Sequence, residues 1–175
     1  MTTHPLDLTP INYSDLNARQ KENYNFQKVS AVFAGYGYNS IRLNDDWQGA
    51  DFIAYHKDGQ QSLKVQLKGV LTVDAKKYYK KDIWVCFPWM KRWYIYDHDT
   101  ALSWLLDTRA RMGETKGWEC SNCSRLKVTS QCVSEGHDIK GGHTFLNPSK
   151  AILRWLEAWE LKPQTLQGRW GQTTR

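Results

Sequence analysis

The chain contains no long hydrophobic run. No stretch of about 18 consecutive apolar residues occurs, and a helix needs that length to cross a bilayer. Residues 1–5 also lack the charged and apolar regions of a secretory signal, so we expect a cytoplasmic protein. Internal repeats and low-complexity tracts are absent as well. The 175 residues fit one domain, with room for a small appendage.

Cysteine is scarce, with four residues in the chain. In an intracellular protein such cysteines are more often thiols or metal ligands than disulfides. Cys86 lies in an apolar run and is interpreted as a core residue. The other three fall within one polar segment later in the chain.

Acidic residues are outnumbered by basic ones. The 18 Asp and Glu against 24 Lys and Arg give a net charge of +6 and a pI of about 9.1. This balance suits a polyanionic partner without requiring one. Nine Trp and nine Tyr are unusually many, and most are expected in the core or in subunit contacts, although aromatic rings also stack on bases.

Hydrophobic periodicity predicts an α/β fold, with one helix before a strand meander and two helices after it. The first helix is expected from Ser14 as N-cap to about residue 34, because Phe26, Val29 and Phe33 recur at helical spacing. Strands are expected at 38–43, 51–55, 62–68, 83–87 and 93–96. The later helices are expected at 100–110 and 149–161.

Two of the predicted strands form a hairpin that brings polar side chains together. Asp58 and Gly59 are a two-residue turn signal, and this turn sets Asp51 opposite Gln66. Because side chains alternate along a strand, Gln66 and Lys68 share the face of Asp51. The opposite face is apolar and consists of Phe52, Ala54, Leu63, Val65 and Leu67.

The polar side chains of this hairpin suit the hydrolysis of a phosphodiester. The reaction needs a hydroxide near phosphorus, a cation to neutralise developing charge, and a donor for the attacking or leaving oxygen. Asp51 and Gln66 would bind Mg²⁺ through side-chain oxygens, and the Leu67 backbone carbonyl offers another hard ligand. Lys68 would orient or activate the water.

A further acid is expected from the first helix. Glu22 lies on the same helical stripe as Phe26 and Phe33, so its carboxylate points at the sheet. Helical stripes also often end in an exposed glutamate near the first turns. Asp45 and Asp46 are competing acids.

The order of these residues resembles that of a known superfamily. Helical Glu22 is followed by the runs Gly37-Tyr38-Asn39-Ser40-Ile41-Arg42, Gly49-Ala50-Asp51 and Gln66-Leu67-Lys68. This order is similar to that of the PD-(D/E)xK nucleases, in particular Holliday-junction resolvases and Mrr-type restriction endonucleases, over roughly residues 16–96. The resemblance implies a restriction-endonuclease-like mixed sheet flanked by helices and one or two magnesium ions. It also implies an active site of Glu22, Asp51, Gln66 and Lys68.

Two residues depart from the superfamily pattern. Ala50 replaces the proline before the aspartate, which affects only the shape of the strand's start. Gln66 replaces an Asp or Glu, and a neutral amide binds Mg²⁺ less strongly than a carboxylate, so the site would hold one ion or need substrate phosphate to bind it. Gln-x-Lys variants occur among some restriction and homing endonucleases of this superfamily. In the competing interpretation, Asp51 and Lys68 are a solvated cross-strand pair.

Residues 111–147 form a polar segment rich in Gly, Ser and Cys. The segment is too long for an ordinary loop and is interpreted as an insertion that is stabilised by its own cross-link. The cysteines and histidines of the segment could bind a zinc ion. Four protein ligands would leave no open position on that ion, so its role would be structural. The alternative is a set of free cysteines in a surface loop. The candidate zinc ligands are Cys120, Cys123, Cys132 and His137, with His143 as an alternative fourth ligand.

Candidate contacts to nucleic acid follow the hairpin. The run Lys76-Lys77-Tyr78-Tyr79-Lys80-Lys81 interleaves four cations with two rings and would track a phosphate backbone. Lys91 and Arg92, at a predicted strand turn, would extend that surface. In the alternative interpretation, the lysine run and the Lys91–Arg92 pair lie in solvated loops that bind no partner.

These expectations combine into a hypothesis of a cytoplasmic DNA endonuclease that hydrolyses phosphodiester bonds with Mg²⁺ or Mn²⁺. A homodimer is compatible with it, because cutting two strands usually takes two sites. The rivals are a catalytically inactive nucleic-acid-binding module and an interaction subunit with the same fold. The expected divisions are a lead at 1–13, the nuclease core at 14–110, the zinc insertion at 111–147, a region with a C-terminal amphipathic helix at 148–166 and a flexible tail at 167–175.

Overall fold

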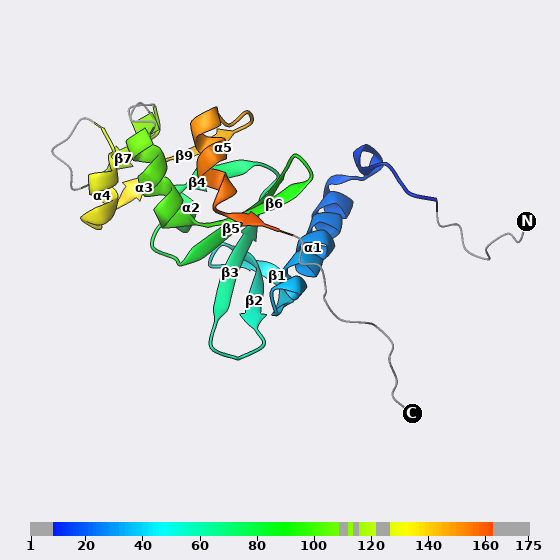
Figure 1. The fold of residues 1–175 in the computed structure, drawn as a ribbon. Helices are drawn as coiled ribbons and strands as arrows, with labels where there is room; N and C mark the ends of the chain where they lie inside the picture. Colours follow the sequence, from blue (N-terminus) through cyan, green and yellow to red (C-terminus); the bar gives the residue numbers. More distant parts are fainter. Residues whose placement is uncertain (1–8, 109–111, 114–115, 122–126, 163–175) are drawn as a thin grey trace, which may run out of the picture.

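A six-stranded mixed sheet with helices on both faces organises the chain (Figure 1). The structure, a computed structural model, describes residues 9–108, 112–113, 116–121 and 127–162, with the backbone alone at 46–47. The strand order is β1, β2, β3, β5, β6, β10, and all neighbours are antiparallel except β3 and β5, which are parallel. The predicted α/β class and the helix-flanked mixed sheet are therefore confirmed.

The five strands expected from the sequence are all present in the main sheet. Its strands are β1 Tyr38–Trp47, β2 Ala50–His56, β3 Ser62–Leu67, β5 Ile83–Trp89, β6 Arg92–Asp97 and β10 Glu160–Leu161. Two small sheets pair β4 Leu71–Asp74 with β9 Gly142–Phe145, and β7 Glu119–Cys120 with β8 Ile139–Lys140. The helices are α1 Ala18–Gly35, α2 Ala75–Tyr78, α3 His98–Thr108, α4 Ser130–Ser134 and α5 Lys150–Glu157, with a 3₁₀ turn η1 at Tyr13–Asp15.

The hairpin of β2 and β3 has the predicted register. Phe52 lies opposite Val65 and Tyr55 lies opposite Ser62, as the turn at Asp58 and Gly59 requires. Gly59 has a φ of 73°, a left-handed conformation that glycine adopts without strain. Local turn chemistry therefore sets which side chains face each other across these two strands.

Helix α1 begins later than the sequence predicts. Ser14 lies in η1, and Asn17 is the N-cap instead. The Asn17 side chain accepts the backbone N–H of Gln20, and the Gln20 side chain accepts that of Asn17, both at 2.9 Å. This reciprocal capping box satisfies two backbone donors, which explains why the helix starts here rather than after Ser14.

Both faces of the main sheet are buried. Along β5, Val85 and Phe87 face one core and Cys86 faces the other, as strand alternation requires. Val29 and Phe33 of α1 pack on the Cys86 side, where each is at most 2% exposed, so the predicted stripe is confirmed. Burying a side chain such as Phe33 contributes about 1.5–3 kcal/mol, which holds α1 against the sheet.

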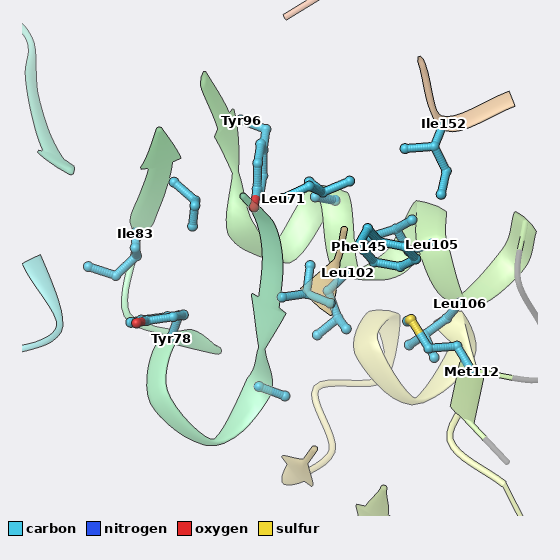
Figure 2. Close-up of a cluster of buried hydrophobic side chains, with 14 of the residues drawn as sticks. Leu71, Tyr78, Ile83, Tyr96, Leu102, Leu105, Leu106, Met112, Phe145 and Ile152 are labelled. Carbon is cyan, nitrogen blue, oxygen red and sulfur yellow. The ribbon is translucent and has the colours of Figure 1, made fainter. Parts of the chain in front are cut away.

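The larger core fills the opposite face, between the sheet and α3, α5 and the β4–β9 pair (Figures 1 and 2). Leu102, Leu105 and Leu106 of α3 are buried there. Segment 111–147 also contributes to this core, through Met112, Val128, Cys132, Ile139 and Phe145. Its described residues are thus packed against the body of the protein.

The prediction of a helix through residue 161 is wrong at its end. Helix α5 stops at Glu157, and Glu160–Leu161 form the edge strand β10, which pairs with β6. The Trp159 carbonyl accepts the N–H of Ile95 at 3.0 Å, so the last residues satisfy the open edge of β6. Among the described helices, none is long and apolar enough to cross a membrane.

Candidate functional site

Asp51 and Gln66 meet where β2 and β3 begin to diverge. One oxygen of Asp51, Oδ2, accepts the backbone N–H of Leu67 at 2.8 Å and the side-chain amide of Gln66 in a closer contact. The predicted proximity of Asp51 and Gln66 is therefore confirmed. The carboxylate also takes over a backbone donor just beyond the last paired residues of the hairpin, so it supports β3 as well as the site.

Gln66 is held in a nearly enclosed position. It is 6% exposed, and its Nε2 also lies 3.3 Å from the carbonyl oxygen of Leu67. A half-turn of the amide exchanges its nitrogen and oxygen without changing its shape, so the same position can present either atom. With the oxygen inward, Asp51, Gln66 and Leu67 offer three hard oxygen donors. We call this group the oxygen site.

Lys68 follows directly after β3. Its backbone N–H donates to the Cys86 carbonyl at 2.8 Å, which continues the hydrogen bonding to β5. Its Nζ lies 5.3 Å from the centre of the Tyr78 ring, a cation–π distance. Tyr78 is 2% exposed, so α2 provides a fixed surface against which the lysine is held. The amine is thus placed on the α2 side of the sheet.

Glu22 and Asp51 line one small pocket of about 140 Å³ at the start of α1. Glu22 therefore faces the sheet, as predicted, although its side chain is 46% exposed. Its carboxylate binds Arg42 of β1 closely and Arg19 at 3.3 Å. Asp45 lines the same pocket. The side chain of Asp46 lies outside the described residues.

Arg42 is a site residue to which the sequence analysis gave no role. Besides Glu22 it binds the Asn23 side chain, and its guanidinium carbon lies 5.5 Å from the centre of the Phe26 ring. The available signal was its alternation with exposed Ile41, which turns Arg42 towards α1. The guanidinium of Arg42 faces α1, and the Glu22 carboxylate on that helix forms an ion pair with it.

Gly49 positions the turn that leads into Asp51. Its φ of 94° is unfavourable for other residues, and a Cβ here would lie 3.1 Å from the ring of Tyr78. Glycine thus lets the backbone approach α2. The Lys77 carbonyl oxygen would lie 3.6 Å from the same Cβ, so α2, with its exposed Lys76 and Lys77, packs beside the turn before Asp51.

The other expected DNA contacts differ in how free they are. Lys80 donates to the Gly136 carbonyl at 2.5 Å and lies 3.7 Å from Asp138, while Arg92 binds Glu160 at 3.0 Å. The rings between the lysines turn inward: Tyr78 is in the core, and the Tyr79 hydroxyl donates to a backbone carbonyl of the Cys-rich segment. The exposed basic residues of the group are Lys76, Lys77, Lys80, Lys81, Lys91 and Arg92.

A second cluster of possible metal ligands lies in segment 111–147. Potential ligand atoms of Cys120, Cys132 and His137 all lie within 4.8 Å of one another. The predicted ligand Cys123 lies outside the described residues. His143, the predicted alternative, is elsewhere: it is exposed on β9, with its ring centre 4.5 Å from that of Phe145. The structure therefore groups three of the five candidate residues.

Comparison of the chain with protein-family models, curated proteins and solved structures returned no match.

Proposed function

We propose that this chain is a metal-dependent DNA endonuclease with a restriction-endonuclease-like fold. The observation that carries the proposal is the oxygen site, where Asp51, Gln66 and the Leu67 carbonyl converge beside a pocket that Glu22 also lines. These are the hard donors that Mg²⁺ or Mn²⁺ prefers. Their order along the chain and their elements agree with the PD-(D/E)xK resemblance.

The residues of the oxygen site would divide the work of hydrolysis. Asp51, Gln66 and the Leu67 carbonyl would hold the ion, which supplies positive charge to a phosphate and lowers the pKa of water. Lys68 would orient the attacking water or stabilise the oxygen on which negative charge develops. The burial of Gln66 favours its role as a metal ligand, because a nearly enclosed ligand keeps its position during the reaction.

Glu22 would join the site by exchanging a partner. Its carboxylate is bound to Arg42 and Arg19 in the structure, and it lines the pocket together with Asp51. A cation bound at Asp51 would compete with Arg42 for Glu22. The released guanidinium would then be available to a phosphate, which arginine binds through paired donors.

The basic surface of α2 supports DNA as the substrate class. Lys76 and Lys77 are exposed and adjoin the turn before Asp51, so a phosphate backbone bound there would pass the oxygen site. Such contacts give affinity without sequence specificity. Two copies of the chain would be needed to cut both strands in one encounter, and a homodimer belongs to this proposal.

The proposal is tested with plasmid and branched DNA in the presence of Mg²⁺ or Mn²⁺. Lys68→Ala should lower the cleavage rate about 10²-fold or more, since a positioned proton donor or acceptor contributes about that much. Lys28→Ala is the matched control, because Lys28 also lies 5.3 Å from a tyrosine ring but belongs to α1 and not to the end of β3 beside the oxygen site. Cleavage that survives Lys68→Ala would overturn the assignment.

A non-catalytic nucleic-acid-binding module is the second candidate. It is favoured by the Gln66 amide, which donates to Asp51 as a simple structural hydrogen bond, and by the Arg42–Glu22 pair. Calorimetry discriminates the two. Salt-dependent DNA binding without any Mg²⁺ uptake in the presence of DNA would favour this module.

A further inference from the structure

Two sulfurs and an imidazole converge at one point of segment 111–147, away from the oxygen site. Cys120 ends strand β7, Cys132 lies in α4 and His137 follows that helix. The Cys120 sulfur lies 3.6 Å from His137 Nδ1, and the ligand atoms of all three residues lie within 4.8 Å of one another. Zinc, at about 2.0–2.3 Å from nitrogen and sulfur ligands, fits between atoms at such separations.

We propose that Cys120, Cys132 and Nδ1 of His137 bind a zinc ion that ties β7 to α4. The two sulfurs and the imidazole are the donors that zinc selects, whereas magnesium and calcium select oxygen. We call this group the thiolate site. It is independent of the proposed nuclease activity, because it shares no residue with the oxygen site.

Glu135 orients the histidine for this role. Its Oε2 lies 3.4 Å from His137 Nε2, on the ring nitrogen opposite the one that faces Cys120. The other carboxylate oxygen accepts the Gln131 side chain at 2.5 Å, which restrains the carboxylate. A carboxylate on the far nitrogen fixes the ring's tautomer and its orientation. The backbone N–H of His137 also donates to the Cys132 carbonyl at 3.0 Å.

Cys132 is built into the core at the same point. It is fully buried, and its sulfur accepts the backbone N–H of Thr129 at 3.4 Å. The Thr129 hydroxyl lies 3.6 Å from the same sulfur. These contacts fix the position of the sulfur from the side of Thr129. A buried sulfur of this kind gives the ion a rigid anchor in the body of the protein.

The ion would act as a structural cross-link between these three ligands, with water or a further ligand in the fourth position of the tetrahedron. Strand β7 pairs with β8, where Glu119 lies opposite Lys140 and Cys120 opposite Ile139. A ligand from α4 would join this two-residue strand to a helix that packs against α3. Such a bond contributes folding free energy directly.

The redox state of Cys120 decides whether the site can form. In the structure the Cys120 sulfur is part of a disulfide. A disulfide sulfur is not a thiolate, so zinc binding requires the reduced protein. Cys86 does not interfere, because burial raises the pKa of its thiol and keeps it protonated and unreactive.

The test is metal analysis of the full chain, purified and kept under a thiol-free reductant. Wild-type protein should carry about one zinc per chain, and Co²⁺ in its place should give sulfur-to-metal charge-transfer absorption. His137→Ala should lower zinc affinity at least 10-fold, and Glu135→Gln about 10-fold. His143→Ala is the matched control and should bind zinc as wild type does, because it removes a histidine of the same segment outside the cluster.

Each alternative result is decisive. Reduced wild-type protein that binds neither zinc nor Co²⁺ overturns the proposal, as does equal zinc affinity in the His137→Ala and His143→Ala variants. Should His137→Ala not fold, Glu135→Gln carries the test, because it changes only an orienting side chain. Zinc affinity of that variant equal to wild type would overturn the proposal of a zinc site in which Glu135 orients His137.

Discussion

The oxygen site and the thiolate site bring their ligands together in different ways. At the oxygen site the donors satisfy one another, because Gln66 and the Leu67 N–H both donate to Asp51. At the thiolate site the donor types differ: two sulfurs and an imidazole are the ligands that zinc prefers. The identity of the donors is therefore the stronger indication of a metal at the thiolate site. At the oxygen site, the indication comes from the surroundings.

Those surroundings differ in openness as well as in charge. The oxygen site lies beside a pocket of about 140 Å³ that includes half-exposed Glu22, so a phosphate can approach it. The thiolate site has fully buried Cys132 as its anchor and a carboxylate already engaged with His137. The oxygen site therefore suits catalysis, which needs an exchangeable ion and access for the substrate. The thiolate site, with its buried ligand, suits an ion that stabilises the fold. Changes at one site should leave the other site's readout unaltered.

The largest effect is expected from Asp51→Asn. It should lower DNA cleavage about 10³-fold or more, because the metal loses its carboxylate ligand. The amide oxygen of the new residue can still accept the Leu67 N–H, so the fold should survive. Asp51→Ala also removes the acceptor of the Leu67 N–H, so it should lower the unfolding free energy by about 1–3 kcal/mol more. Cleavage assays and urea denaturation measure the two effects.

The same variants sharpen the comparison through zinc. Asp51→Asn and Asp51→Ala should keep the zinc content of wild type, because Asp51 is absent from the thiolate cluster. Loss of zinc together with cleavage would show that the two sites are not independent.

The strand register at Asp51 could be predicted from the sequence, because it depends on local rules. A two-residue turn and strict alternation place Asp51 beside Gln66 without knowledge of the rest of the fold. The stripe of Val29 and Phe33 was accessible for the same reason. These features depend on residues close in the sequence.

Features that depend on distant partners were not accessible. The helical pattern continues through Trp159, yet Glu160–Leu161 become a strand because β6 presents an open edge. The pairing of Arg42 with Glu22 joins a strand to a helix 20 positions away. Each depends on a tertiary contact that a one-dimensional pattern does not contain.

Removal of zinc should give the next largest effect, on stability rather than on cleavage. In Mg²⁺-free, reducing buffer, a zinc chelator should lower the unfolding free energy by about 3 kcal/mol if zinc is present at 100 times its dissociation constant. His137→Ala should be less stable from the outset and insensitive to the chelator. His143→Ala should respond as wild type does. A chelator effect of equal size in both variants would place the stabilising ion elsewhere.

Gly49→Ala should produce an intermediate loss of stability. It forces a residue with a Cβ to a φ of 94° and puts that Cβ 3.1 Å from the Tyr78 ring, so it should cost about 1–3 kcal/mol. Gly59→Ala is the matched control: its φ is 73°, and nothing lies within 4 Å of its added Cβ. Its cost should be about 1 kcal/mol. Thermal denaturation compares them.

The cleavage readout separates these two turns further. Gly49 adjoins both Asp51 and α2, so Gly49→Ala should also raise the Mg²⁺ concentration needed for cleavage, while Gly59→Ala should not. Equal effects of the two substitutions on cleavage would argue that the turn before Asp51 has no part in the oxygen site.

The smallest effect, and the one that bears most directly on catalysis, is expected from Gln66→Glu. Gln66 is 6% exposed and in contact with Asp51, so a second carboxylate there repels the first in the absence of metal. The variant should be less stable than wild type without Mg²⁺ and should gain more stability when Mg²⁺ is added. Its half-maximal cleavage should need about tenfold less Mg²⁺, because a carboxylate is a stronger ligand than an amide.

Gln131→Glu is the matched control for Gln66→Glu. Gln131 also donates its side-chain amide to a carboxylate, that of Glu135, but it is exposed and belongs to the surroundings of the thiolate site. This variant should leave the Mg²⁺ dependence of cleavage unchanged. If Gln66→Glu raises neither Mg²⁺ affinity nor cleavage above wild type, the Asp51–Gln66 contact is a structural hydrogen bond. The non-catalytic nucleic-acid-binding module is then the better account of this fold.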